Sequence, residues 1–125
     1  MEVKFFKCSR CGQFLTVLDP KCPGVSCCGE PATELKANTS DGAAEKHVPA
    51  VTVDGNRVSV NVGSVDHPMA DDHYIQWVYV HTENGGQQKN LVPGQKPHAD
   101  FVLADDKAVA VYGYCNKHGL WVAQL

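Results

Sequence analysis

The chain has 125 residues, of which 43% are hydrophobic, and its formal net charge is −3. This length suits one domain, or one small domain with a very small one beside it. The weak net charge gives no reason to expect binding to nucleic acid or to a membrane surface. No apolar run approaches the roughly 20 residues that a membrane-spanning helix needs.

The first residues, MEVKFFKC, lead directly into a potential metal ligand. We therefore expect no signal peptide and a cytoplasmic location. Six cysteines are present, and in a reducing compartment such a number favours metal binding over disulfides.

Residues 1–36 are predicted to form a small metal-binding domain. Two knuckle-like turns carry its four ligand candidates, which are Cys8, Cys11, Cys27 and Cys28. About 36 residues cannot bury enough surface to be stable without a metal or cross-link. Four thiolates suit either zinc or iron, and spacing alone does not separate the two metals. The adjacent pair Cys27-Cys28 predicts a distorted tetrahedron, and Cys22 is either a free thiol or an alternative ligand.

The stretch 37–45 (ANTSDGAAE) is small and polar and is expected to be a linker. From residue 46 to residue 125 the pattern is that of short β-strands. Strands are expected around 51–53, 58–62, 75–80, 101–103, 109–111 and 120–122. Asp54-Gly55 is a hairpin signal, and Asn84-Gly85-Gly86 is expected to be a turn. The fold class is therefore all-β, with a β-sandwich as the larger domain.

The larger domain carries a second set of candidate ligands, richer in nitrogen. Its members are His47, His67, His73, Cys115 and His118. Five ligands are too many for ordinary tetrahedral zinc, but four imidazoles and one thiolate suit ferrous iron with one coordination position left open. Such a centre would bind a very small ligand, such as an oxygen species. His81 and His98 lie in no suggestive motif and are not expected to be ligands.

Together, these motifs resemble the desulfoferrodoxin family of two-iron superoxide reductases in both order and spacing. The motifs are Cys8-x-x-Cys11-Gly, Cys27-Cys28-Gly-Glu-Pro, Glu45-Lys46-His47-Val-Pro, Gly63-Ser-Val-x-His67-Pro-Met and Tyr-Cys115-Asn-x-His118-Gly-x-Trp121. The resemblance implies a desulforedoxin-like domain with iron on the four cysteines, followed by an immunoglobulin-like sandwich with iron on the histidine set. Zinc remains possible in the cysteine site. The implied reaction is the one-electron reduction of superoxide to hydrogen peroxide without release of dioxygen.

The resemblance also implies roles for two neighbouring charged residues. Lys46 would steer superoxide and assist its protonation, and Glu45 would cap the ferric iron. The plain alternative is a solvated charge pair. Asp66, before His67, departs from the family pattern and is expected either to orient an imidazole or to face solvent.

Rubredoxin or a similar small carrier would donate electrons, and the chain would form a homodimer; both follow from the resemblance. Two other classes of function stay open: an electron carrier without catalysis, and a zinc-stabilised interaction module. The first would need no open metal position, and the second would leave the histidine set without a purpose.

Overall fold

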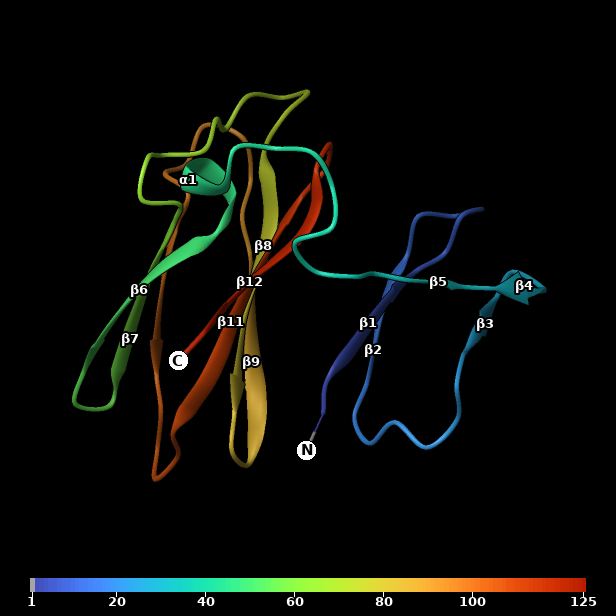
Figure 1. Cartoon of the computed structure of the whole chain (residues 1–125), viewed down its shortest axis with the longest axis horizontal. Coiled ribbons are helices and arrows are strands. Elements are labelled where there is room, and N and C mark those ends of the chain that lie inside the picture. The colour runs from blue at the N-terminus through green and yellow to red at the C-terminus, as the bar shows by residue number, and fades with distance from the viewer. Residues whose placement is uncertain (1) are drawn as a thin grey trace. The chain divides into compact units, whose positions relative to one another are not determined.

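The computed structural model describes residues 2–125, which divide into two compact units. The border between the units falls after Lys36. Both units are built almost entirely from antiparallel strands, as the sequence predicted (Figure 1). Within residues 2–125, no helix is long and apolar enough to span a bilayer.

Short strands surround the cysteines of the first unit. In chain order they are β1 (Lys4–Lys7), β2 (Phe14–Val17), β3 (Ser26–Cys27), β4 (Glu30–Pro31) and β5 (Thr33–Glu34). β1 lies between β2 and β5 in one small sheet, and β3 pairs with β4 in a hairpin. These strands are too short to supply much of a core, and among residues 2–36 the buried side chains are those of Phe5, Phe6 and Cys8.

The second unit is a β-sandwich of seven strands. In chain order its elements are α1 (Ala44–His47), β6 (Pro49–Asp54), β7 (Arg57–Val62), β8 (Ile75–Thr82), β9 (Gly85–Asn90), β10 (His98–Val102), β11 (Ala108–Cys115) and β12 (Gly119–Gln124). One sheet has the order β10-β7-β6 and the other the order β12-β11-β8-β9. This arrangement, with the first, second and fifth strands in one sheet, is immunoglobulin-like.

Alternating residues of facing strands fill the space between the two sheets. Val58, Val60 and Val62 of β7 are fully buried, and Phe101 of β10 is 1% exposed. They pack with residues of β8 and β11 in one cluster that ends at Cys115. The valine alternation that predicted β7 therefore reflects one strand face that lies against the core.

One strand was not predicted from sequence, because β9 (GGQQKN) is polar and exposed along its whole length. The turn expected at 84–86 ends at Asn84, and Gly85 already belongs to β9. β9 is an edge strand, and its side chains reach the neighbouring edge strand β10. Gln87 donates to the carbonyl of Val102 at 2.9 Å, and Lys89 donates to that of Asp100. Polar side chains thus satisfy edge carbonyls that would otherwise be open to pairing.

The linker expected at 37–45 is not seen, since this stretch belongs to the second unit. The Asn38 amide donates to the carbonyl of Leu120 at 2.9 Å, and its side-chain oxygen accepts from the amide of Val122 at 2.9 Å. Asn38 therefore continues the sheet at the free edge of β12. The stretch ends in the single helical turn α1, so the sandwich unit begins at residue 37 and not at 46.

We predict that Phe101→Ala lowers the free energy of unfolding of the sandwich by about 3–5 kcal/mol, because it leaves a cavity in a packed core. The neighbouring Val102→Ala is the control, since Val102 is 57% exposed and should cost less than about 0.5 kcal/mol. Tryptophan fluorescence during urea unfolding measures both, because Trp77 and Trp121 both lie in this unit. Equal losses in the two variants would contradict the assigned core.

Candidate metal centres

Four imidazoles and one thiol gather at one end of the sandwich, where several strands begin or finish. His47 closes α1 just before β6, and His67 and His73 lie in the loop between β7 and β8. Cys115 is the last residue of β11, and His118 precedes β12. The structure thus brings together all five residues of the predicted nitrogen-rich set, with donor atoms within 4.8 Å of one another.

The four imidazole rings form a closed circle. Neighbouring ring centroids are 4.6 Å apart for His47–His67, 4.7 Å for His67–His73, 5.1 Å for His73–His118 and 4.8 Å for His118–His47. Each ring is turned by 74° to 87° from the next. Such an arrangement points one nitrogen of each ring toward a common centre.

Hydrogen bonds decide which nitrogens are free to bind a metal. Nδ1 of His47 lies 2.8 Å from the carbonyl of Ala43, and Nδ1 of His67 lies 2.7 Å from the carbonyl of Pro68. A carbonyl only accepts, so both Nδ1 atoms carry the proton and both Nε2 atoms are bare. Yet these two Nε2 atoms face each other at 3.1 Å. Two lone pairs at that distance repel, and a cation between them removes the conflict.

The remaining donors agree with a metal at this centre. Nε2 of His73 is buried and has no hydrogen-bond partner among residues 2–125. Nδ1 of His118 lies 3.0 Å from Nε2 of His47 and 3.9 Å from the sulfur of Cys115. The residues present therefore fit a metal that takes four nitrogens and one sulfur, such as iron.

Burial keeps this centre ready for a cation. It lowers the pKa of His67 from 6.5 to about 4 and also lowers the pKa values of His47 and His73, so these rings stay neutral and keep their lone pairs. Burial raises the pKa of Cys115, while the backbone amides of Lys117 and His118 oppose that rise. The His118 amide lies 3.4 Å from the Cys115 sulfur, which favours the thiolate that a metal needs.

Asn116 ties the two ligand-bearing loops together. Its side-chain oxygen accepts from the amide of Tyr74 at 2.9 Å, and its side-chain nitrogen donates to the carbonyl of Asp72 at 3.0 Å. Its own amide donates to the carbonyl of Tyr74 at 3.2 Å. Because Asn116 lies next to Cys115 and these partners flank His73, the three bonds fix the thiol and that imidazole relative to each other.

Glu45 and Lys46, the predicted functional pair, lie in α1 with exposed side chains directly before His47. The carbonyl of Glu45 accepts from the amide of Val65 at 2.9 Å and from the hydroxyl of Ser64 at 3.2 Å. A Cβ on Gly63 would lie only 2.6 Å from this carbonyl oxygen. The turn 63–65 therefore holds the backbone that carries both charged residues.

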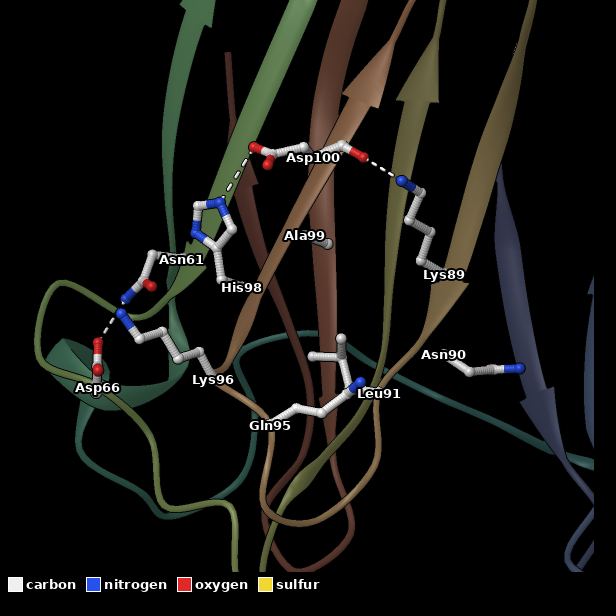
Figure 2. A pocket seen from close by; sticks show the side chains of 10 residues that line it. All are labelled: Asn61, Asp66, Lys89, Asn90, Leu91, Gln95, Lys96, His98, Ala99 and Asp100. Atoms are coloured by element: carbon white, nitrogen blue, oxygen red, sulfur yellow. Dashed lines mark hydrogen bonds and ion pairs between the residues drawn. The ribbon is translucent and has the colours of Figure 1, made fainter.

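Asp66 does not orient an imidazole. Its carboxylate accepts from the side-chain amide of Asn61 at 2.8 Å, while the acceptor for His67 is the Pro68 carbonyl. Figure 2 shows Asp66 and Asn61 on one side of a polar pocket beside β10, with His98 next to Asn61 and Lys89 on the far side. Of the two alternatives for Asp66, exposure to solvent is the one observed.

The four cysteines of the first unit form the second group, with sulfur atoms within 4.8 Å of one another. The sulfur atoms of Cys11 and Cys27 are 3.8 Å apart, which is about the edge of a tetrahedron of thiolates around a metal at roughly 2.3 Å. Cys28 and Gly29 form the two-residue turn between β3 and β4, with φ of +54° and +74°. This left-handed turn lets adjacent cysteines reach one centre.

Without a cation, the four thiols cannot all lose their protons. A hydrogen bond from the Cys11 amide lowers the pKa of Cys8 to about 6, whereas hydrogen bonding to Cys8 raises the pKa of Cys27 to about 12. The pKa of Cys28 is raised as well, first by its hydrogen bond with Cys11. One thiolate thus forms at the expense of its neighbours, and a metal would stabilise all four.

Three further candidates lie outside both groups. Cys22 is an exposed free thiol and is not part of the sulfur cluster. His98 lies beside Asp100 at 3.1 Å on the surface, and His81 lies on β8. Neither histidine belongs to a donor group among residues 2–125.

Several residues that shape the nitrogen-rich centre had no role assigned from sequence. The imidazole of His47 stacks on the indole of Trp121, with ring centroids 4.9 Å apart and planes 29° apart. Trp121, Gly63 and Asn116 were motif positions without a stated function. Their partners are distant in the chain, so only a structure identifies them.

Known proteins with similar sequences identify the family of this chain. The family model described as desulfoferrodoxin matches residues 39–124. This chain belongs to the desulfoferrodoxin family. A desulfoferrodoxin of Nitratidesulfovibrio vulgaris is 42% identical over 123 residues, covering 98% of this chain and 97% of that protein. The family model covers the nitrogen-rich centre, whereas the match to the relative spans nearly the whole chain and so includes the residues of both metal centres.

Solved structures extend the comparison within the desulfoferrodoxin family. The superoxide reductase from Treponema pallidum is 39% identical, with a TM-score of 0.87, covering 99% of this chain and 100% of that one. A superoxide reductase (1Fe-SOR) from Giardia intestinalis is 32% identical, with a TM-score of 0.56, covering 65% of this chain and 97% of that one.

We predict that the metal-free protein loses stability as the pH falls from about 6.5 toward 4. In this window the unfolded chain protonates His67, but the folded chain, in which burial lowers the pKa of His67 to about 4, does not. Unfolding therefore takes up protons, and acid favours it. Urea unfolding of chelator-treated protein at several pH values measures the effect. His67→Gln should flatten the profile, and an equally steep profile in that variant would contradict the assignment.

Proposed function

We propose that this chain is a superoxide reductase and that its active centre is the group of His47, His67, His73, His118 and Cys115. The observation that carries the proposal is the pair of unprotonated nitrogens of His47 and His67, which face each other at 3.1 Å inside a circle of imidazoles. A metal cation between these nitrogens would remove their repulsion, and a thiolate ligand would donate electron density to that metal. The relatives described as superoxide reductases support the same conclusion.

Ferrous iron bound by these five residues would supply the single electron that reduces superoxide to the oxidation level of peroxide. With that electron and two protons, superoxide gives hydrogen peroxide, and no dioxygen forms. The protein must therefore attract an anion, keep the thiolate ionised and provide protons. Each of these tasks falls to residues of this chain.

Attraction of the anion is the proposed role of Lys46. Besides burial, the charge of Lys46 lowers the pKa of His47, and the charge of Lys117 lowers that of His73, so both ammonium groups act on the centre electrostatically. Lys117 lies 3.9 Å from a carboxylate oxygen of Asp72, whereas Lys46 forms no ion pair with any of residues 2–125. A lysine with no carboxylate partner lowers the free energy of an approaching anion most effectively.

The proposed proton donor, Lys46, and the proposed ligand of the oxidised metal, Glu45, are neighbours in the helical turn α1. The Lys46 ammonium is an acid that can donate toward an oxygen that gains negative charge. Glu45 would offer its carboxylate to the oxidised metal. The anchoring of the Glu45 carbonyl by Ser64 and Val65 supports both roles, because it holds this backbone beside His47.

The four-cysteine group would hold a second iron, with zinc as the alternative metal, in the domain formed by the residues up to Lys36. Its thiolates suit one-electron chemistry or a structural role. Rubredoxin or a similar carrier as electron donor, and a homodimer as the assembly, remain predictions from the family resemblance. Six free cysteines agree with a reducing, cytoplasmic compartment.

The proposal is tested with anaerobically purified protein by metal analysis and by product analysis after superoxide pulses. We expect two irons per chain, and hydrogen peroxide without evolution of dioxygen. Cys115→Ser should abolish superoxide reduction, because it removes the thiolate, and leave the colour of the cysteine centre intact. Unchanged superoxide consumption in this variant would refute the assigned centre, and zinc in the cysteine site would make that site structural.

We further predict that Lys46→Ala slows the reaction with superoxide by about 10-fold at low ionic strength, because the steering charge is lost. Added salt should slow the parent more than the variant, since screening removes an attraction that the variant lacks. Lys107→Ala is the matched control: it makes the same change in net charge at an exposed lysine just before β11, at the opposite end of that strand from Cys115. Pulse radiolysis measures the rates, and equal slowing in both variants would show that only net charge matters.

A further inference from the structure

Two ligands that are 71 residues apart in the sequence, His47 and His118, both contact one aromatic side chain. The indole of Trp121 stacks on His47 at a centroid distance of 4.9 Å, and its Nε1 donates to the backbone carbonyl of His118 at 3.1 Å. Trp121 is only 5% exposed and is not a member of the donor group. Any displacement of the indole would therefore move His47 and His118 together.

Residues 38–42, here named the strap, secure the same pair from the edge of β12. Asn38 fixes the start of the strap through its hydrogen bonds to Leu120 and Val122. Two residues later, the Ser40 hydroxyl donates to the carbonyl of His118 that also accepts from Trp121. Two donors on one carbonyl fix the peptide that follows the His118 ring.

The end of the strap closes against both rings at Gly42. A Cβ at this position would lie 3.1 Å from Cε1 of His47 and 3.1 Å from Cζ2 of Trp121. Both neighbours are stiff rings in a stacked pair, so they cannot yield as a flexible side chain would. Glycine is needed here because the backbone passes directly over the edge where the imidazole meets the indole.

We infer that Trp121 and the strap are positioning elements that couple the orientation of His47 to that of His118. Residues that hold metal ligands in place tune both the affinity for the metal and its electronic properties. This inference rests on the proposed metal centre but not on its reaction. It goes beyond that function by assigning a role to a stretch that has the composition of a linker.

Cobalt(II) binding tests the inference through both spectrum and affinity. Absorption bands of the cobalt-loaded parent that vanish in Cys115→Ser belong to the nitrogen-rich centre. Trp121→Phe keeps an aromatic ring but removes the donor to His118, so it should shift these bands and weaken cobalt binding in a chelator competition by about 10-fold or more. Trp77→Phe is the matched control, because it makes the same substitution at a buried tryptophan that stacks, at 5.5 Å, on Tyr114 instead of on a ligand imidazole. It should leave the bands in place and the affinity within about twofold.

Gly42→Ala gives an independent test, with Gly24→Ala as its control, since a Cβ on Gly24 meets nothing within 4 Å. The Gly42 variant should shift the same bands, and its effect should not add to that of Trp121→Phe if both act through the ring stack. Parent-like bands and affinity in both Trp121→Phe and Gly42→Ala would overturn the inference, even if thermal stability fell. If the parent binds cobalt at this centre but the iron-loaded parent does not reduce superoxide, the proposed function is refuted and the inference about Trp121 and the strap still stands.

Discussion

Two unprotonated imidazole nitrogens, 3.1 Å apart, set the conditions for one whole end of the sandwich. Each ring is fixed by a hydrogen bond to a neighbouring carbonyl, so neither ring can turn away without losing that bond. Burial keeps both rings neutral, which preserves the two lone pairs and also their repulsion. The fold thus holds two lone pairs close together, a metal cation would relieve their repulsion, and the surrounding loops keep both rings in this position.

The ligands are also held in place by contacts with residues that surround them but do not bind the metal. Asn116 binds the loop of Cys115 to the residues on both sides of His73, the turn 63–65 holds the backbone before His47, and Trp121 connects His47 with His118. Each contact joins segments that are far apart in the sequence. The ligands come from three segments, which are α1, the loop between β7 and β8, and the end of β11 with the turn to β12. Contacts between these segments position the ligands, in addition to the strands beside them.

The sequence revealed the ligands because metal chemistry restricts residue type and spacing. The cysteine knuckles and the Cys115–His118 pair are such patterns, and the alternation of Val58, Val60 and Val62 identified a buried strand face in the same way. The contacts that position the ligands have no such pattern. Ser40 and Gly42 lie in a stretch of small polar residues that has the composition of a linker, and only the fold reveals that they meet His118 and His47. β9 was missed for a related reason: an exposed edge strand needs no apolar side chains, so it leaves no period to detect.

The two metal groups also differ in what the metal does for the fold. The first unit has strands of two to four residues and little core of its own, so its metal must supply stability, and four thiolates that enclose the ion serve that purpose. The sandwich has a continuous core of buried, mainly aliphatic residues that includes Cys115, and this packed core contributes to its stability apart from any metal. The ligands of this centre can therefore serve the reaction, whereas those of the cysteine centre serve the stability of their unit. His73 and His118 remain partly exposed, while His47, His67 and Cys115 are buried, so the ligand set extends from the core to the surface of the sandwich.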